Sequence, residues 1–197
     1  MKSEIFVDKW FSTPIWETQL TLNNLELSNW AYSLQKNYPG VHKSNKGGWQ
    51  CAELNNPPDS YISLKESINN ILVDVHSSMG LKQEYKSVIT ESWLNINPPQ
   101  SYNAKHLHPR SLFSGVYYIS VPQGDCGNII FERDPLMLSY LPSYVVKDWN
   151  DMTSGTTSYV PKEGKLLIFP SWLLHWVETN NTQNDRISLS FNTNYDF

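Results

Sequence analysis

The spacing of apolar residues changes near Tyr85, and this change restricts the folds open to the chain. Upstream of it, two segments have apolar residues at helical spacing, residues 24–37 and 59–79. Downstream, period-two alternation predicts short strands near 86–97, 112–121, 128–132, 157–160, 165–170, 174–178 and 186–194. Helices followed by short strands indicate a mainly β fold, a sandwich or jelly roll, with the helices packed along one outer face of the β unit.

The second helical segment has the clearer signals. Pro57 and Pro58 precede it and Gly80 ends it, while Asn23 or Asn24 is the expected cap of the first helix. The predicted apolar stripe of the second helix consists of Leu64, Ile68, Ile71, Val75 and Met79. We expect His76 to lie on the surface of this helix and His42 to lie in a loop, both without a role in chemistry.

The remaining segments are less regular. Residues 1–20 predict one or two short strands broken at Pro14, and residues 40–48 are rich in turn formers and predict a loop. Residues 133–157 are too long for an ordinary turn. Such an insertion is usually a functional lid or a mobile segment, and we expect a lid that selects the substrate.

Size, charge and cysteine content restrict the class of protein. A chain of 197 residues suits one domain, and a net charge of −4 without a basic block argues against a nucleic-acid partner. Cys51 and Cys126 match no metal-binding spacing and are expected to be free thiols in a reducing compartment. No apolar run is long enough to span a membrane and the N-terminus lacks a signal-peptide core, so we expect a soluble, cytoplasmic protein. Short exposed edge strands often pair in this architecture, so a homodimer is a further hypothesis.

The last predicted strand carries polar residues on one face. Period-two alternation groups them there, and we expect this face to line a site as much as to meet solvent; they are Arg186, Ser188, Ser190, Asn192 and Asn194. An apolar run that begins at Gly164 ends at His175, and a polar loop separates His175 from the strand that begins at Arg186. The last strand therefore places a cation and hydroxyls beside a potential metal ligand.

Two further histidines complete a candidate metal site. His106 and His108 stand at i and i+2, so they leave a strand end on the same side. Together with His175 they could bind one face of an octahedral ion such as Fe(II) and leave the other positions open. A 2-oxo acid can chelate the open positions. Its distal carboxylate would then suit Arg186 with Ser188, to which the Tyr118 hydroxyl could add a third donor.

These residues together resemble the Fe(II)/2-oxoglutarate-dependent oxygenase superfamily. The order His106-x-His108, Tyr117-Tyr118, His175, Arg186-x-Ser188 matches the superfamily pattern. More closely, the chain resembles a group of 2OG-Fe(II) oxygenases of bacteria and phages. That resemblance covers nearly the whole chain and is carried by Phe11-Ser-Thr-Pro-Ile15, Ser44-Asn-Lys-Gly-Gly-Trp49-Gln, Ser114-Gly-Val-Tyr-Tyr118, Asp134-Pro135 and Phe169-Pro-Ser171.

The resemblance implies a single oxygenase domain over residues 1–197 with a double-stranded β-helix (cupin-like jelly roll) core. Residues 1–84 would support a core formed by 85–197. It implies Fe(II) as cofactor, 2-oxoglutarate and O2 as cosubstrates, and hydroxylation of a protein side chain or a metabolite with release of succinate and CO2. Within the pocket, we expect Asn95 to help bind the cosubstrate and Asn97, with Trp93 or Trp172, to line the walls.

One position departs from the superfamily pattern. His108 stands where the superfamily has a carboxylate, so His108 is the third ligand or a carboxylate such as Glu132 or Asp134 replaces it. Two other functions stay open. A cupin-type metal enzyme would use the three histidines without 2-oxoglutarate and would not need Arg186. A jelly-roll binding module without catalysis would bind no metal.

Overall fold

The computed structural model describes residues 5–138 and 141–196. Residues 1–4 of the predicted N-terminal strand region and residues 139–140 of the predicted lid lie outside the described residues. The elements run in the order β1 (Trp16–Gln19), α1 (Asn24–Asn37), β2 (Asn45–Lys46), β3 (Trp49–Cys51), α2 (Asp59–Ser78), β4 (Ser87–Asn97), β5 (Tyr102–His106), β6 (Phe113–Ser120), β7 (Ile129–Glu132), η1 (Pro135–Leu138), η2 (Ser143–Val145), β8 (Thr156–Tyr159), β9 (Lys165–Pro170), β10 (Leu174–Val177) and β11 (Arg186–Tyr195).

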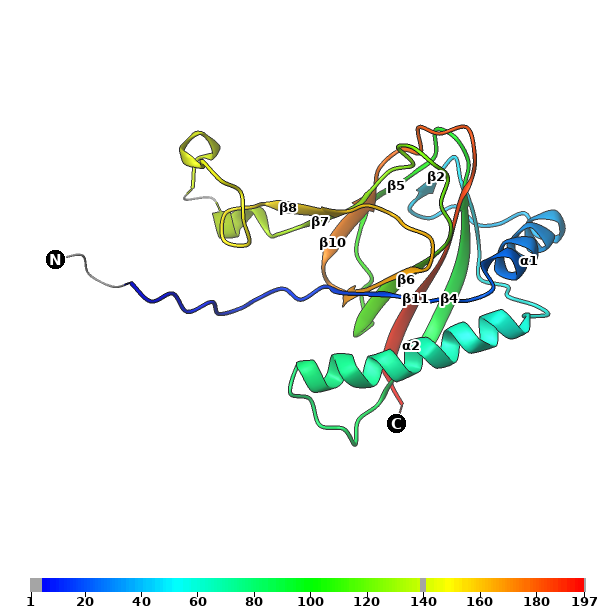
Figure 1. Ribbon diagram of the computed structural model, residues 1–197, viewed down its shortest axis with the longest axis horizontal. Helices are drawn as coiled ribbons and strands as arrows, with labels where there is room; N and C mark the ends of the chain where they lie inside the picture. Colours follow the sequence, from blue (N-terminus) through cyan, green and yellow to red (C-terminus); the bar gives the residue numbers. More distant parts are fainter. Residues whose placement is uncertain (1–4, 139–140, 197) are drawn as a thin grey trace.

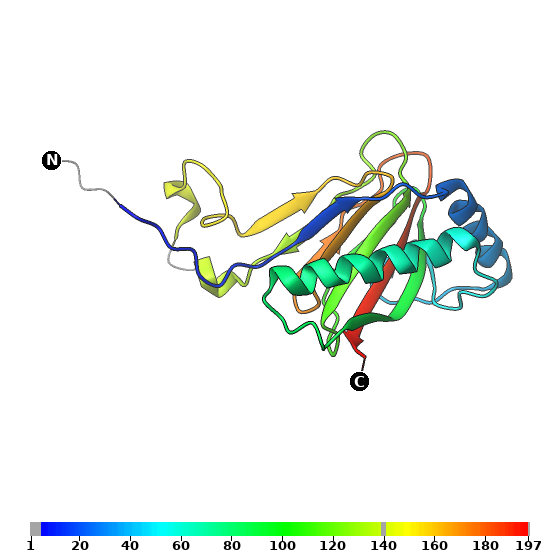
Figure 2. The same cartoon turned by 60° about the horizontal axis from the view of Figure 1, so that its bottom comes forward.

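The strands form two antiparallel sheets that face each other as a jelly roll. One sheet has the order β1-β9-β6-β11-β4-β3 and the other β2-β5-β10-β7-β8. Figure 1 shows α2 running below the first sheet and α1 beside it. In Figure 2, α2 crosses the outer face of the first sheet. The predicted jelly roll with helices on one face is therefore confirmed.

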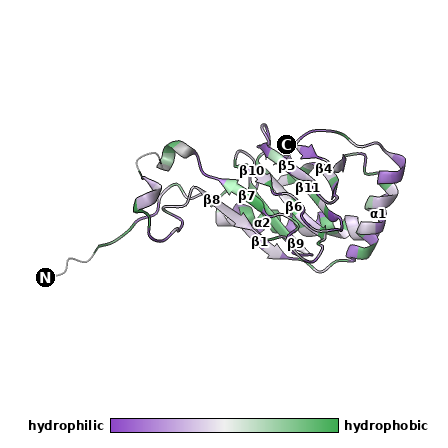
Figure 3. Ribbon diagram, turned by 90° about the horizontal axis from the view of Figure 1, so that it is seen from above, coloured by the Kyte–Doolittle hydropathy of each residue, from purple (hydrophilic) through white to green (hydrophobic). Residues whose placement is uncertain are grey.

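Two apolar clusters follow from the alternation of side chains on the first sheet. On β6, Tyr117 and Ile119 face outward and join the helices in one cluster, which includes Leu27 and Leu64. Val116 and Tyr118, along with Phe131 of the second sheet, belong to the other cluster between the sheets. Figure 3 shows hydrophobic colour concentrated in the central strands of the body. The space between the sheets is only partly filled by apolar groups, which leaves room for a polar cavity.

Both helices begin and end near the predicted residues. Asn23 caps α1, its side-chain oxygen accepting a hydrogen bond from the Glu26 N–H at 3.2 Å. Gly80 follows α2 with φ of 68°, a left-handed conformation that suits glycine at a helix end. The predicted stripe of α2 needs correction, because Leu72 is buried whereas Met79 lies beyond the helix and is 45% exposed.

His76 does not lie on the helix surface as expected. It is buried on the inner side of α2, where its Nε2 lies 3.0 Å from Ser87 Oγ. Aromatic rings of Phe113 and Tyr195 flank it. The prediction was wrong because a histidine one position after Val75 still falls within the broad face that α2 turns toward the sheet.

Three strands were missed in the sequence. The predicted loop at 40–48 contains β2, β3 follows directly, and β5 leads to His106. β2 and β5 carry mostly polar residues and pair with each other, whereas β3 pairs with β4. Short polar strands give little hydrophobic alternation, so pairing rather than local sequence determines them.

Residues 133–157, here called the extension, project from the body between β7 and β8 (Figure 1). The N-terminal arm, residues 5–13, runs beside it (Figure 2) and is joined to it by an ion pair of 2.6 Å between Lys9 Nζ and Asp151 Oδ2. Arg133 donates hydrogen bonds to the backbone oxygens of Asp151 and Met152, which holds the two ends of the extension together. In the described part of the chain, neither α1 nor α2 combines the length and the hydropathy that a membrane-spanning helix requires.

Candidate active site

A cavity of about 770 Å³ lies between the two sheets. The inward faces of β4 and β11 form one wall, where Asn97 is opposite Arg186, Asn95 opposite Ser188, and Glu91 opposite Asn192. All seven site residues predicted from the sequence line this cavity: His106, His108, His175, Arg186, Ser188, Tyr118 and Asn95. The polar face of β11 therefore points inward as predicted, up to Asn192.

Asn194 is the exception on β11. The register of β11 against β4 shifts between Asn192 and Thr193, a β-bulge that turns the following residues. Thr193 is fully buried, while Asn194 is outside the cavity and its Nδ2 donates to the Arg110 backbone oxygen at 3.1 Å. Simple alternation therefore holds only as far as the bulge.

The three histidines converge at one side of the cavity. His106 at the end of β5 is paired in register with His175 on β10, and their ring centroids are 4.3 Å apart. His108 follows β5, and its N–H donates to the Ser171 backbone oxygen at 2.9 Å, which turns its ring toward the other two. One ring nitrogen of each histidine lies within 4.8 Å of the others. This spacing lets a single metal ion reach all three.

The hydrogen bonds of two rings determine which nitrogen faces the cavity. His106 Nδ1 lies 2.7 Å from the Ala104 backbone oxygen, and His175 Nδ1 lies 2.8 Å from that of Leu173. Because a carbonyl only accepts, each Nδ1 carries the proton, and the lone pair of the neutral ring is on Nε2. Both rings therefore present a metal-binding Nε2 in a fixed orientation.

Burial keeps these imidazoles neutral. It lowers the pKa of His175 to about 3 and that of His108 to about 4, with the charge of His106 as a further cause in both. The pKa of His106 is also lowered by burial. Neutral imidazole is the form that binds a metal, so the donor set suits Fe(II) at neutral pH.

Arg186 lies at the other end of the cavity and is only 2% exposed. Its Nη1 donates to the backbone oxygens of Cys126 at 2.5 Å and Gly127 at 2.9 Å. Among the described residues, no carboxylate forms an ion pair with it. A buried cation without an anionic partner is costly, so this end of the cavity favours a bound carboxylate.

Polar groups near Arg186 have spare hydrogen-bonding capacity. Burial raises the pKa of Tyr118 to about 12, partly offset by the charge of Arg186, so its hydroxyl stays protonated and able to donate. Asn95 Nδ2 donates to Ser190 Oγ at 3.1 Å. Asn95 Oδ1 is buried without a hydrogen-bond partner.

The sequence of the chain matches a family model over residues 91–192, slightly more than half of its length. The family is described as "Putative 2OG-Fe(II) oxygenase". This chain belongs to that family. The family assignment makes it an Fe(II)- and 2-oxoglutarate-dependent oxygenase rather than a binding module. No curated protein matches its sequence.

Solved structures share the fold of this oxygenase at low sequence identity. A prolyl-4-hydroxylase of Pseudomonas putida is 13% identical with a TM-score of 0.63, and the match covers 94% of each chain. HygX of Streptomyces hygroscopicus, solved with nickel and 2-oxoglutarate, is 12% identical with a TM-score of 0.64, covering 94% of this chain and 84% of that one. The epimerase SnoN from nogalamycin biosynthesis is 12% identical with a TM-score of 0.67, covering 92% and 78%. These matches show the jelly-roll fold.

The alternative carboxylate ligands of this oxygenase are occupied elsewhere. Glu132 Oε2 forms an ion pair with Lys105 Nζ at 2.5 Å. Asp134 Oδ1 accepts a hydrogen bond from the Leu136 N–H at 2.9 Å. Neither residue lines the cavity, and the cluster able to hold a metal among the described residues consists of the three histidines.

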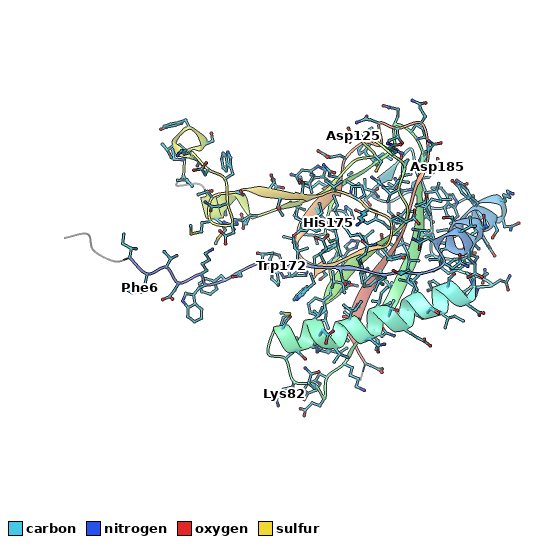
Figure 4. All side chains as sticks on the ribbon, in the orientation of Figure 1. Phe6, Lys82, Asp125, Trp172, His175 and Asp185 are labelled. Carbon is cyan, nitrogen blue, oxygen red and sulfur yellow. The ribbon has the colours of Figure 1, made fainter. Side chains whose placement is uncertain are left out.

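One expected wall residue lies outside the cavity, and others were missed. Trp172 is 60% exposed, and Figure 4 shows it near the outer edge of the body while His175 lies within. Glu91 lines the cavity and could have been found by extending the alternation of Trp93, Asn95 and Asn97. Lys43 and Gln50 also line it, but no signal in the sequence marks them, because their position depends on β2 and β3.

Proposed function

We propose that His106, His108 and His175 are the Fe(II) ligands of this oxygenase, so that a third histidine replaces the usual carboxylate. The supporting observation is the convergence of three neutral rings whose ligand atoms lie within 4.8 Å of one another. Three neutral ligands would leave the full dipositive charge of the ion to attract the cosubstrate. The fixed orientation of His106 and His175 would hold the ion without rearrangement.

We propose further that Arg186 binds the distal carboxylate of 2-oxoglutarate, with Ser188, Tyr118 and Asn95 around it. Arg186 is the buried cation of the cavity, and the protonated Tyr118 hydroxyl suits a carboxylate acceptor. Asn95 would contribute through a reorientation of its amide or through a bridging water. Two anchor points, the metal and Arg186, would fix the dianion along the length of the cavity.

When bound, Fe(II) supplies the chemistry that couples oxidative decarboxylation of 2-oxoglutarate, giving succinate and CO2, to oxidation of the substrate. The residues of this chain bind, orient and exclude water. Apolar groups such as Val116, Phe169 and Val177 line the same cavity and reduce its water content. A protein side chain or a metabolite is the proposed substrate.

Several predictions from the sequence stay proposals. The extension would act as a lid, although none of its described residues lines the cavity, so closure would require it to move. A single domain over 1–197, a cytoplasmic location and pairing of two copies likewise stay predictions. Cys51 and Cys126 are both buried free thiols.

The experiment is anaerobic visible spectroscopy of the metal-free protein after addition of Fe(II) and then 2-oxoglutarate. We expect the weak charge-transfer band of a chelated 2-oxo acid. His175→Ala and His108→Ala should abolish it, and His108→Asp should restore it if position 108 is a ligand. His42→Ala, in the exposed loop outside the cavity, is the matched control.

Two results would contradict the proposal. A normal band in His108→Ala would exclude His108 as a ligand. Binding of Fe(II) without any band in the wild-type protein would mean that 2-oxoglutarate does not chelate the metal at this site, and Arg186 would then need another role.

A further inference from the structure

Three charged side chains line the cavity, and only one is explained by the proposed function. Arg186 is buried at one end, whereas Lys43 and Glu91 are exposed and therefore open to an incoming molecule. Glu91 is the only residue with a carboxyl group among the described residues that line the cavity. Lys43 and Glu91 thus give the accessible part of the cavity one positive and one negative charge.

Both charges lie close to the proposed metal site. Lys43 and Glu91 line the same cavity as His108, and the Ala104 N–H donates to Ser44 O at 2.9 Å, which places the residue after Lys43 beside the strand that ends at His106. Trp93, two residues after Glu91 on β4, has its ring centroid 5.6 Å from that of His108. A molecule held between Lys43 and Glu91 would therefore lie beside His108, where a substrate must be for oxidation.

The Glu91 carboxylate is held in place by buried neighbours. Asn192 Nδ2 donates to Glu91 Oε2 at 2.9 Å, and Asn192 Oδ1 accepts from Ser114 Oγ at 2.8 Å. Asn192 is 5% exposed and Ser114 is fully buried. Because a single oxygen of Glu91 takes part in this chain of hydrogen bonds, the other can accept from a ligand.

The loop that carries Lys43 is also fixed. Asn45, 2% exposed, accepts from the Lys43 N–H at 2.7 Å and donates to the backbone oxygens of Val41 at 3.0 Å and Gly48 at 2.9 Å. Ser44 O accepts from the Ala104 N–H at 2.9 Å, which joins this loop to β5. The buried amide of Asn45 therefore sets the position from which the Lys43 side chain extends.

The two charges come from opposite sheets. Glu91 belongs to β4 of the six-stranded sheet, and Lys43 precedes β2 of the five-stranded sheet, which also holds His106. In the described part of the chain, Lys43 and Glu91 form no ion pair with each other or with any other residue. A carboxylate and an ammonium group on facing walls fit a ligand that carries both opposite charges.

We propose that the substrate of this oxygenase is a free amino acid, whose ammonium group binds Glu91 and whose carboxylate binds Lys43. The inference rests on the proposed function. Its reaction balances as amino acid, 2-oxoglutarate and O2 giving hydroxylated amino acid, succinate and CO2. A residue inside a polypeptide has lost both charges to peptide bonds, so it would gain nothing from these two groups.

The test measures binding by calorimetry to the wild-type protein loaded with Fe(II) and 2-oxoglutarate without oxygen. The probes are the twenty standard amino acids, each of which is compared with its N-acetyl, amide and doubly capped derivatives. We expect at least one free amino acid to bind. Acetylation of its amino group or amidation of its carboxylate should each weaken binding about tenfold or more, because each removes one charge-assisted contact. Binding of no free amino acid, or equal binding of the doubly capped form, would overturn the proposal.

Variants then assign each charge. Glu91→Gln should weaken binding of the free amino acid about tenfold or more, and it should reduce the difference in affinity between the free amino acid and its N-acetyl form. Lys43→Met should weaken binding to the same extent, and it should reduce the difference in affinity between the free amino acid and its amide. Lys46→Met and Glu66→Gln, both exposed and outside the cavity, are the matched controls. Unchanged affinity in both test variants would also overturn the proposal.

The charge-transfer band of the wild-type protein distinguishes a failure of the substrate proposal from a failure of the proposed function. A band without amino-acid binding overturns only the substrate assignment. Absence of the band in the wild-type protein overturns the iron and 2-oxoglutarate sites themselves.

Discussion

The cavity of the barrel and the extension place polar and apolar side chains in opposite ways. In the cavity, Arg186, Asn95 and Ser188 are buried, and hydrogen bonds hold Arg186 and Asn95, whereas in the extension Tyr144 and Trp149 are 87% and 58% exposed. The N-terminal arm beside it resembles the extension, with Phe6 83% exposed and far from the body in Figure 4. Buried polar groups are costly unless they are paired or used, so the proposed chemistry is assigned to the barrel. No described residue of the extension belongs to either apolar cluster of the body.

The largest effect should come from removing the buried cation of the cavity. Arg186→Met should weaken 2-oxoglutarate binding by about 2–5 kcal/mol, the usual cost of truncating one partner of a buried charge pair. Anaerobic titration of the Fe(II) protein with 2-oxoglutarate measures this. Arg110→Met, at an exposed position outside the cavity, is the control and should bind as the wild type does. Equal affinity in Arg186→Met would remove Arg186 from the cosubstrate site.

A smaller effect is expected from overpacking the six-stranded sheet. A Cβ at Gly115 would lie 2.6 Å from Phe191 Cε1 and 2.7 Å from the Leu167 backbone oxygen. Gly115→Ala should therefore lower the free energy of unfolding by about 1–3 kcal/mol, as overpacking of a core does. Chemical denaturation measures it, and adding Phe191→Leu should restore part of the loss. Wild-type stability in Gly115→Ala would show that the strands shift easily at this point.

The smallest effect on the barrel should follow from deleting the extension. Replacing residues 134–153 with a short glycine–serine turn should leave the Fe(II)·2-oxoglutarate band intact, because no described residue of the extension lines the cavity. If the extension is a lid, uncoupled turnover of 2-oxoglutarate should persist while substrate oxidation is lost. Loss of the band would show instead that the extension supports the barrel.

Strong periodicity allowed most of the fold and the proposed site to be predicted. The last strand was predicted with Arg186, Ser188 and Asn192 on its inner face, because one alternating segment of ten residues spans the sheet. The three histidines were grouped from their residue type and spacing, and the structure brings His106 and His175 together because β5 and β10 pair antiparallel.

What could not be predicted depends on contacts between distant segments. The exposed position of Trp172 and the pairing of Glu132 with Lys105 follow from turns and cross-strand neighbours, which leave no local pattern. The same holds for Lys43, whose place at the cavity depends on two-residue strand pairing between β2 and β5. Local alternation specified the longer strands, whereas tertiary pairing specified the short strands β2, β3 and β5.

The backbone oxygens that hold Arg186 determine what kind of change could alter the choice of cosubstrate. They belong to Cys126 and Gly127, and Gly127 has φ of 84° in a turn where a side chain would collide with the main chain of Glu178 and Thr179. The path of the main chain therefore sets the distance between the Arg186 guanidinium and the three histidines. A substitution at position 126 would leave the backbone oxygen, and therefore the position of the guanidinium, unchanged. An insertion or deletion in the loop before β7 would move the guanidinium. It would thereby change the length of the dicarboxylic acid that the cavity accepts.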